Sequence, residues 1–331
     1  MNKKDAGLLA LILFVGAVVA ILNPRFLLPI NISNTSNLVG LFGLSAIGQA
    51  FVIITGGIEL SVGSVIALVG VLFVDFIAVE GVPWPLAFAA MLALGVAIGT
   101  VHGLLVTRLR MQPFVVTLCG LLIYRGAARF YTQDATAGFG FGQNFPTLEW
   151  LTAGRTYGVP HSVVALAIVA TGMWVVLHRS VFGRHLYAVG KNEEAARYSG
   201  IRTGRVVVAA YVICGALTAI SAVFFAMYTR SISPASHGNF YELYAIAAAV
   251  LGGFSLKGGE GSVIGVVLGT ILLQELQNLV NLLGIPSSLN FSVMGGVILA
   301  GVLVDGQWSR FRERRRAVGA ASTDQPITAP K

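Results

Sequence analysis

Apolar residues in this chain occur in long unbroken runs, not in the apolar–polar alternation of a half-buried strand. Short segments rich in Gly, Pro, Asn or charged residues separate the runs. Inside a bilayer only helices and closed barrels satisfy every backbone polar group, and unbroken apolar runs favour helices. The sequence therefore predicts an all-α, polytopic integral membrane protein with about ten transmembrane helices. The predicted spans cover residues 6–22, 38–55, 65–79, 86–106, 113–126, 161–177, 206–227, 240–254, 263–283 and 292–304.

The composition supports a surface covered by lipid. Of the 331 residues, 56% are hydrophobic and only 11% are charged, and the mean hydropathy is +0.80. A soluble protein carries roughly 25% charged residues, so this chain has too few charges to cover a soluble surface. The net charge of +8 is concentrated in a few segments, which indicates membrane orientation and not a nucleic-acid partner.

The distribution of basic residues predicts the orientation of the spans. Lys3 and Lys4 precede the first run, and no clear cleavage site follows it, so we interpret it as an uncleaved span and not as a signal peptide. Alternating ten spans from an inner N-terminus places seventeen Lys and Arg residues inside and five outside. We therefore expect both termini to lie on the inner side.

The longest strongly polar insert between spans covers residues 183–205 and is rich in Lys and Arg. Within it, the segment from Glu194 to Gly200 (EAARYSG) combines helix-forming residues with a terminal Gly, which predicts a short surface helix of about two turns. A small-residue helix with a basic rim suits a groove on a soluble partner. A charged loop that only obeys the positive-inside rule explains the composition equally well.

The turns at 56–64 and 252–262 resemble each other, since both open with Gly-Gly and close with Gly-Ser-Val-Ile. Internal repeats are common in transporters, so the similarity is compatible with a duplication. Either turn could be re-entrant, although changing one alone would invert the predicted tail.

Four blocks resemble the ribose-type sugar permeases of bacterial ABC importers, and they stand in that family's order. They are IGQAFVIITGGIELSVGS at 47–64, PFVVTL at 113–118, GR…YAVG…NEEAARYSGI at 183–201 and YEL…AIAAAVLGG…SL.GGEGS at 241–262. Glu59, where an Asp is common, and Lys191, where a second Gly is common, depart from the family pattern.

The resemblance implies a permease subunit in a bacterial inner membrane, with a permease domain over 1–310. The composition of residues 311–331 predicts a basic, disordered tail. The resemblance implies three protein partners: a second permease copy or paralogue, a cytoplasmic ATP-binding subunit and an extracytoplasmic solute-binding protein. It also implies that the polar insert 183–205 is a coupling loop that engages the ATPase. The coupling residues carried over are Glu193, Glu194, Ala195, Ala196, Arg197 and Gly200.

Polar residues inside predicted spans are candidates for the solute path, because they are costly in lipid unless they line a path or pair with each other. In span nine Gln274, Asn278 and Asn281 share one helical face, which predicts a path lining or a dimer seam. Polar contacts between helices explain the same face. Gln49, Thr55 and Glu59 are further candidates, although Glu59 could simply cap span three.

Several classes of protein are disfavoured. The sequence contains no P-loop, no metal-ligand cluster and no catalytic cluster, so we expect no enzyme activity, metal or cofactor in this chain. We interpret His102 as a packing residue. An ion-coupled secondary transporter remains the alternative, with Glu275 and Asp75 as the mid-span acids that it would need.

Overall fold

The computed structural model describes residues 3–140 and 142–286, together with positions 289, 292, 295, 296 and 299. The chain divides into a unit that ends at Ile285 and a second unit from Pro286, and all elements named below belong to the first unit. The predicted tenth span and the predicted tail 311–331 lie outside the continuously described residues.

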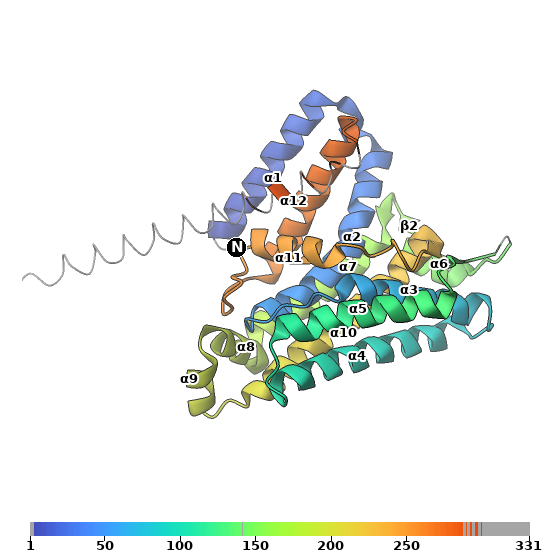
Figure 1. Ribbon diagram of the computed structural model, residues 1–331. Helices are drawn as coiled ribbons and strands as arrows, with labels where there is room; N and C mark the ends of the chain where they lie inside the picture. Colours follow the sequence, from blue (N-terminus) through green and yellow to red (C-terminus); the bar gives the residue numbers. More distant parts are fainter. Residues whose placement is uncertain are drawn as a thin grey trace, which may run out of the picture. The chain divides into compact units, whose positions relative to one another are not determined.

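The described chain is almost entirely helical (Figure 1), as the sequence predicts. Its helices are α1 (Lys3–Leu22), the 3-10 helix η1 (Pro24–Leu27), α2 (Pro29–Ile53), α3 (Val62–Ala78), α4 (Trp84–Thr107), α5 (Pro113–Thr132), α6 (Pro146–Ala153), α7 (His161–Arg179), α8 (Val181–Lys191), α9 (Glu193–Tyr198), α10 (Thr203–Thr229), α11 (Tyr241–Leu251) and α12 (Val263–Leu282). Four two-residue strands pair antiparallel, β1 (Ala137–Gly138) with β4 (Ser231–Ile232) and β2 (Arg155–Thr156) with β3 (Val159–Pro160).

Seven of these helices are long and apolar enough to cross a membrane: α1, α2, α4, α5, α7, α10 and α12. The shorter apolar helices α3 and α11 occupy the positions of predicted spans three and eight. At 1.5 Å per residue, the 11 residues of α11 reach only about half the thickness of a bilayer core. α11 therefore cannot cross by itself, and the expectation of a full span at 240–254 is wrong in this respect.

The predicted loop before span two is also wrong, because α2 begins at Pro29 and not near residue 38. The Asn and Ser residues there suggest a loop, but they find partners on other segments. Asn31 and Asn278 exchange two hydrogen bonds through their side-chain amides, at 3.0 and 2.8 Å. The Ser162 hydroxyl donates to the Asn37 side chain at 2.5 Å. These tertiary contacts stabilise a helix that local propensity disfavours.

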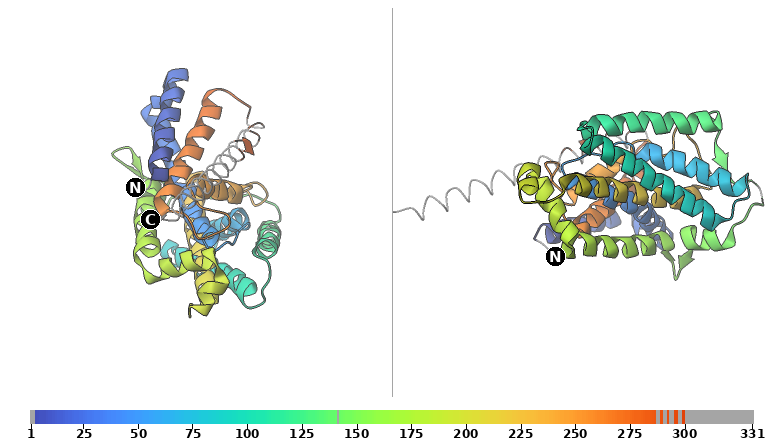
Figure 2. Two further views of the ribbon diagram at one scale, coloured as in Figure 1. Left: turned by 90° about the vertical axis from the view of Figure 1, so that its left-hand side faces the viewer. Right: turned by 90° about the horizontal axis from the view of Figure 1, so that it is seen from below.

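The polar segments fold more than the sequence predicts. The insert 183–205 is not one loop, because most of it belongs to α8, α9 and the start of α10. The connection 126–160 contains the end of α5, the helix α6 and short strands. Figures 1 and 2 place α8 and α9 at one end of the helix bundle and α6 with the strands at the other end.

α10 forms the centre of the bundle and packs against α2, α3 and α4. Gly95, Gly99 and Gly103 recur every four residues on α4 and let its backbone touch that of α10. A Cβ atom added at Gly99 would lie 2.2 Å from the Tyr211 carbonyl oxygen. Small residues spaced four apart commonly allow two membrane helices to approach each other closely.

This contact predicts opposite effects for two Gly→Ala substitutions. Gly99→Ala should lower the free energy of unfolding by about 1–3 kcal/mol, because the methyl group forces α4 away from α10. Gly172→Ala should be neutral or raise it by up to about 1 kcal/mol, since a Cβ there meets no atom within 4 Å and Ala favours helix. Thermal unfolding of the detergent-solubilised variants measures both, and equal stability of the two would contradict the packing argument.

Candidate functional site

The chain between α2 and α3 is an unwound segment inside the bundle. After α2 ends at Ile53, residues 54–56 turn and residues 57–61 are non-helical. Glu59 and Ser61 in this segment are 5% and 1% exposed. Because water is excluded there, the backbone groups that leave the helical pattern need partners from the protein.

Side chains from three helices supply those partners. The Gln49 amide of α2, in the orientation that satisfies both of its groups, donates to the Glu59 carbonyl (3.0 Å) and accepts from the Glu59 N–H (3.2 Å). The Ile58 carbonyl accepts from the hydroxyls of Thr117 in α5 (3.2 Å) and Tyr211 in α10 (3.4 Å). We call residues 58–61 together with these side chains the unwound node.

The Glu59 carboxylate is the polar centre of the unwound node. One oxygen accepts from the N–H (2.7 Å) and hydroxyl (2.6 Å) of Ser61, the residue before α3. The other oxygen lies 2.7 Å from Nδ1 of His102 in α4, and Nε2 of His102 lies 3.0 Å from the Tyr124 hydroxyl in α5. The carboxylate sits at the N-terminus of α3, where the helix dipole favours negative charge.

The unwound node is too tightly packed to hold a sugar in this structure. A cavity of about 10 Å³ lies beside Glu59 and Ser61, which is enough for about one water molecule. Thr218 also lines this cavity, and its hydroxyl has no hydrogen-bond partner among the described residues. The arrangement can fix the positions of four helices, but it offers no room for a solute.

The other residues predicted for a solute path do not converge on one site. Thr55 donates to the Val52 carbonyl in the last turn of α2. Gln274 in α12 is 4% exposed, and its carbonyl oxygen has no partner among the described residues. Asn278 pairs with Asn31, as expected for a polar contact between helices, and Asn281 is exposed.

The two acids that an ion-coupled carrier would need differ in position. Asp75 lies in the last turn of α3 and accepts a hydrogen bond from the Tyr131 hydroxyl, so it is not a mid-span acid. Glu275 lies in the middle of α12, and its Oε2 has no partner among the described residues.

The predicted surface helix exists as α9 and is almost free of contacts with the rest of the fold. Only Ala196 of its six residues is buried, and Tyr198 is 82% exposed. Gly200 follows with φ +84°, the left-handed conformation that Gly adopts without a steric cost. The sequence prediction of a short helix that closes at Gly200 is confirmed.

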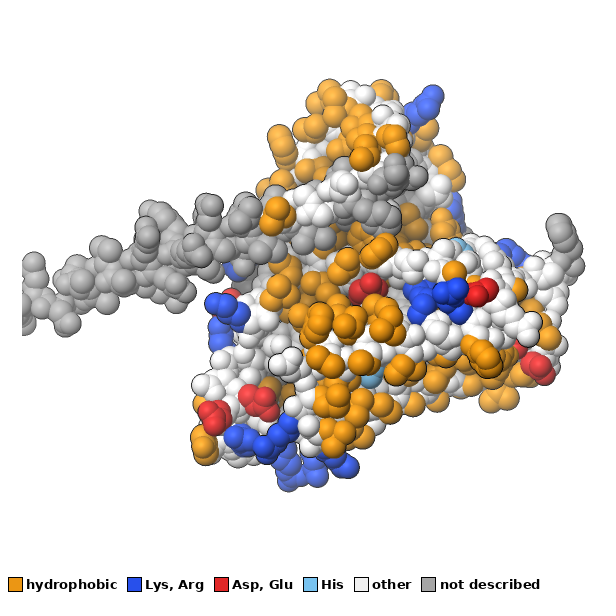
Figure 3. Space-filling view, viewed as in Figure 1, with side chains coloured by type: hydrophobic (Ala, Val, Ile, Leu, Met, Phe, Trp, Pro, Cys, Tyr) orange, Lys and Arg blue, Asp and Glu red, His pale blue; other side chains and the backbone are white. Residues whose placement is uncertain are grey.

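Charge and capping stabilise α9. Asn192 accepts from the Ala195 N–H at 2.9 Å, Glu193 and Glu194 lie in the first turn, and Arg197 lies in the last. This charge order complements the helix dipole. In the space-filling view (Figure 3), Lys and Arg side chains gather at the end of the bundle that carries α8 and α9.

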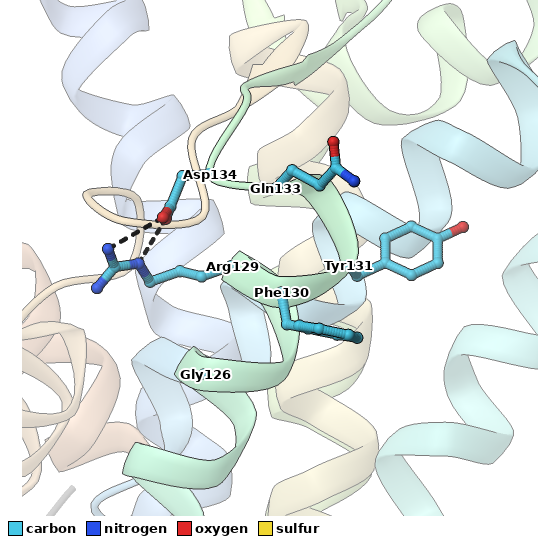
Figure 4. Close-up of a pocket in the computed structure, with 6 residues that line it drawn as sticks. All are labelled: Gly126, Arg129, Phe130, Tyr131, Gln133 and Asp134. Atoms are coloured by element: carbon cyan, nitrogen blue, oxygen red, sulfur yellow. Dashed lines mark hydrogen bonds and ion pairs between the residues drawn. The ribbon is translucent and has the colours of Figure 1, made fainter.

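The opposite end carries paired charges. Arg230 donates to Glu149 at 2.5 Å and to the Gln143 carbonyl, and this contact holds the pKa of the Glu149 carboxyl below its usual range. An open hollow of about 760 Å³ lies at the end of α5. Figure 4 shows Arg129 and Asp134 at this hollow pointing toward each other, and they form an exposed ion pair of little energetic weight.

Sequence reasoning missed the partners of the unwound node. It treated His102 as a packing residue, and it did not single out Tyr124, Thr117 or Tyr211. Polar residues in three apolar runs were the available signal, but the chain alone does not show that they meet at the backbone and side chains of residues 58–61. Sequence reasoning also did not show that Arg230 pairs with Glu149 within the chain.

Comparisons with known proteins agree with the resemblance. Residues 31–302 match the family described as branched-chain amino acid transport system / permease component. The chain is 39% identical over 304 residues to the ribose import permease protein RbsC of Escherichia coli (strain K12), covering 92% of this chain and 94% of that protein.

Of two further relatives, one is again a ribose permease and the other is a permease for a different sugar. The ribose import permease protein RbsC of Bacillus subtilis (strain 168) is 40% identical over 288 residues, with 87% of this chain and 88% of the relative covered. The fructose import permease protein FrcC of Rhizobium meliloti is 31% identical over 314 residues, with 92% and 85% covered. No solved structure matches the chain.

The buried contact between Glu59 and His102 predicts non-additive variants. His102→Leu leaves one oxygen of the buried carboxylate without its partner and should cost about 3–5 kcal/mol of stability. The double variant Glu59→Gln/His102→Leu removes the stranded charge and should be more stable than His102→Leu alone. Thermal unfolding in detergent tests this, with the exposed Glu80→Gln as control, and simple additivity would contradict the pairing.

Proposed function

The chain belongs to the permease components of the branched-chain amino acid transport system family, and from this premise we propose how it works as the membrane-spanning subunit of an ATP-driven sugar importer. The relatives named above are import permeases for ribose and fructose, and the multi-pass helical fold suits a subunit of the bacterial inner membrane. This chain forms the passage for a monosaccharide or a sugar-like solute. The energy comes from a separate subunit that hydrolyses ATP.

The ATPase docks on α9. The observation that carries this assignment is the exposure of α9, since a helix whose residues are nearly all exposed, at an end of the bundle rich in basic residues, is available to a soluble partner. Glu193, Glu194 and Arg197 form its charged rim, Ala195 and Ala196 keep it narrow, and Gly200 ends it.

The remaining assembly follows from the two ends of the bundle. The end with α8 and α9 faces the cytoplasm, together with both termini, and the end with α6 and the strands faces the solute-binding protein. A second permease completes the passage, because this chain encloses no sugar-sized cavity among the described residues of the unwound node. Gln274 and Asn281 on α12 line the passage or the seam between the two permeases, Asn278 holds α12 to α2, and Gln49, Thr55 and Glu59 set the position of α3 beside it.

The orientation predicts opposite labelling of two single cysteines. In a chain with Cys119→Ala and Cys214→Ala, Ser199→Cys beside α9 should react with a membrane-impermeant maleimide only in inside-out vesicles. Tyr157→Cys, at a fully exposed position of the other end, should react in intact spheroplasts. Labelling of both from the same side would exclude the proposed topology.

Docking on α9 predicts loss of the ATPase on charge reversal. Glu194→Lys should abolish co-purification of the ATP-binding subunit, because it inverts the charge at the exposed first turn of α9. The matched reversal Glu80→Lys, in an exposed turn after α3, should leave co-purification unchanged. The amount of ATPase retained by tagged permease measures the effect, and full retention with Glu194→Lys would argue against docking on α9.

An uptake assay in vesicles that contain the purified chain distinguishes an ATP-driven importer from an ion-coupled carrier. Vesicles that contain only this chain should not accumulate solute under an imposed ion gradient, and uptake should require the ATPase, ATP and the binding protein. Gradient-driven uptake by the chain alone, lost with Glu275→Gln, would establish the carrier mechanism instead.

A further inference from the structure

We propose that α8 transmits movement of α9 to α2 and α12 through a backbone contact at Gly190, with Tyr187 and Lys191 as positioning residues. The inference rests on the proposed docking of the ATPase on α9 and adds the route by which that docking reaches the membrane helices. Its elements are the C-terminal turn of α8 and the two Gly-rich turns that follow α2 and α11.

Four glycines bring three backbones into direct contact at this point. We call Gly56, Gly190, Gly258 and Gly259 the glycine junction. A Cβ atom added at Gly190 would lie 1.8 Å from the Ile54 carbonyl oxygen and 2.3 Å from the Gly259 nitrogen. A Cβ at Gly258 would lie 2.8 Å from the Gly56 nitrogen and 2.9 Å from the Gly190 carbonyl oxygen.

The two Gly-rich turns are also hydrogen-bonded to each other, since the Gly259 N–H donates to the Ile54 carbonyl at 2.8 Å. Gly56, Gly258 and Gly259 have φ values of +82°, +85° and +71°, a conformation that favours Gly. Backbone contacts of this kind contain no side chain that could change rotamer and absorb a displacement. Movement of α8 therefore displaces the end of α2 and the turn before α12 together.

Two side chains of α8 fix its register against the second turn. The Tyr187 hydroxyl donates to the Gly261 carbonyl at 2.8 Å, and burial raises the pKa of Tyr187 to about 12, so the hydroxyl keeps its proton at physiological pH. Lys191 Nζ lies 2.6 Å from Glu260 Oε1. The hydrogen bond is partly buried and the ion pair is exposed, so Tyr187 is the stronger of the two contacts.

Both turns lead directly into membrane helices. Four residues after Ile54 the chain enters the unwound node, whose backbone is held by α2, α5 and α10. Immediately after Gly261, Ser262 caps α12 by accepting from the Gly265 N–H at 2.9 Å. At its other end α8 turns sharply from α7, where a Cβ at Gly183 would lie 1.9 Å from the Leu177 carbonyl oxygen. Thus α8 is held at both ends, while α9 beyond it is exposed.

The test uses the complete transporter, with the ATPase and the solute-binding protein, reconstituted in vesicles and supplied with ribose as the probe. Uptake and ATP hydrolysis are measured in the same vesicles, and their ratio is the readout. A fold defect that only reduces the number of working transporters lowers both rates and leaves the ratio unchanged. The variants are Tyr187→Phe and Gly190→Ala, and the matched controls are Tyr228→Phe and Gly172→Ala at exposed positions.

We expect Tyr187→Phe to lower the ribose-to-ATP ratio about fivefold, because it removes the hydroxyl that donates to Gly261 and lies 3.3 Å from Nδ1 of His178. We expect Gly190→Ala to lower the ratio about tenfold or more. Both should retain the ATPase, and both controls should keep the wild-type ratio. An unchanged ratio in Tyr187→Phe and Gly190→Ala would overturn the relay. Loss of the ATPase from these variants would also overturn it, since α8 would then belong to the docking surface.

A wrong assignment of the solute would give a different result from a wrong assignment of the relay. If the wild-type chain takes up no ribose with its partners, but hydrolysis of ATP is still stimulated by the loaded binding protein, the assumed solute is wrong, and stimulation replaces uptake as the readout of the relay. In that case stimulation should be lost in Gly190→Ala and kept in Gly172→Ala. Equal stimulation in both would overturn the relay whichever sugar the transporter carries.

Discussion

The fold depends on satisfying the backbone of a few non-helical residues inside the membrane. Each unsatisfied N–H or C=O group in that environment costs several kcal/mol, so an unwound segment is stable only if other segments supply hydrogen bonds. Here Gln49, Thr117 and Tyr211 bond to the backbone of Ile58 and Glu59, and His102 bonds to the Glu59 carboxylate. The positions of α2, α4, α5 and α10 follow from this requirement.

The second short helix, α11, also begins inside the bundle, next to the start of α3. A Cβ atom added at Gly63 would lie 1.9 Å from the Gly238 carbonyl oxygen and 2.6 Å from Glu242 Oε2, which shows how close the two helix starts are. Glu242 is buried, with 7% of its surface exposed. Two helix N-termini inside the bundle thus have a carboxylate each, Glu59 at α3 and Glu242 at α11, and the helix dipoles favour both negative charges.

Much of the fold could be predicted from the sequence because lipid imposes a simple rule on composition. The bounds of α7, α12 and the start of α5 lie within a few residues of the predicted ones, since Pro113, His161 and Ser262 mark clear changes in polarity. The start of α2 could not be predicted in this way. Asn31 and Asn37 look like loop residues until their partners Asn278 and Ser162 are known, and these lie more than 120 residues away in the chain.

In the candidate site, too, local features could be predicted from the sequence and contacts between distant segments could not. α9 is a local feature, because its cap, its charges and its closing Gly all lie within residues 192–200. The unwound node and the glycine junction depend on contacts between distant segments. Sequence similarity marked the segments that contain Glu59 and Gly190, but nothing local indicates that Gly190 meets Ile54 or that His102 meets Glu59.

Lys191 shows how a departure from the family pattern can be accommodated at a rigid contact. Lys stands here where a second Gly is common in the family, and the structure shows Lys191 as the last residue of α8 with its side chain over Gly259. A Cβ at Gly259 would lie 2.7 Å from Lys191 Cγ, so the larger residue at 191 requires the smallest one at 259. The ion pair with Glu260 is exposed and contributes at most about 1 kcal/mol. The stiffness of the glycine junction therefore arises from backbone contact, and the charges at its rim only set its register.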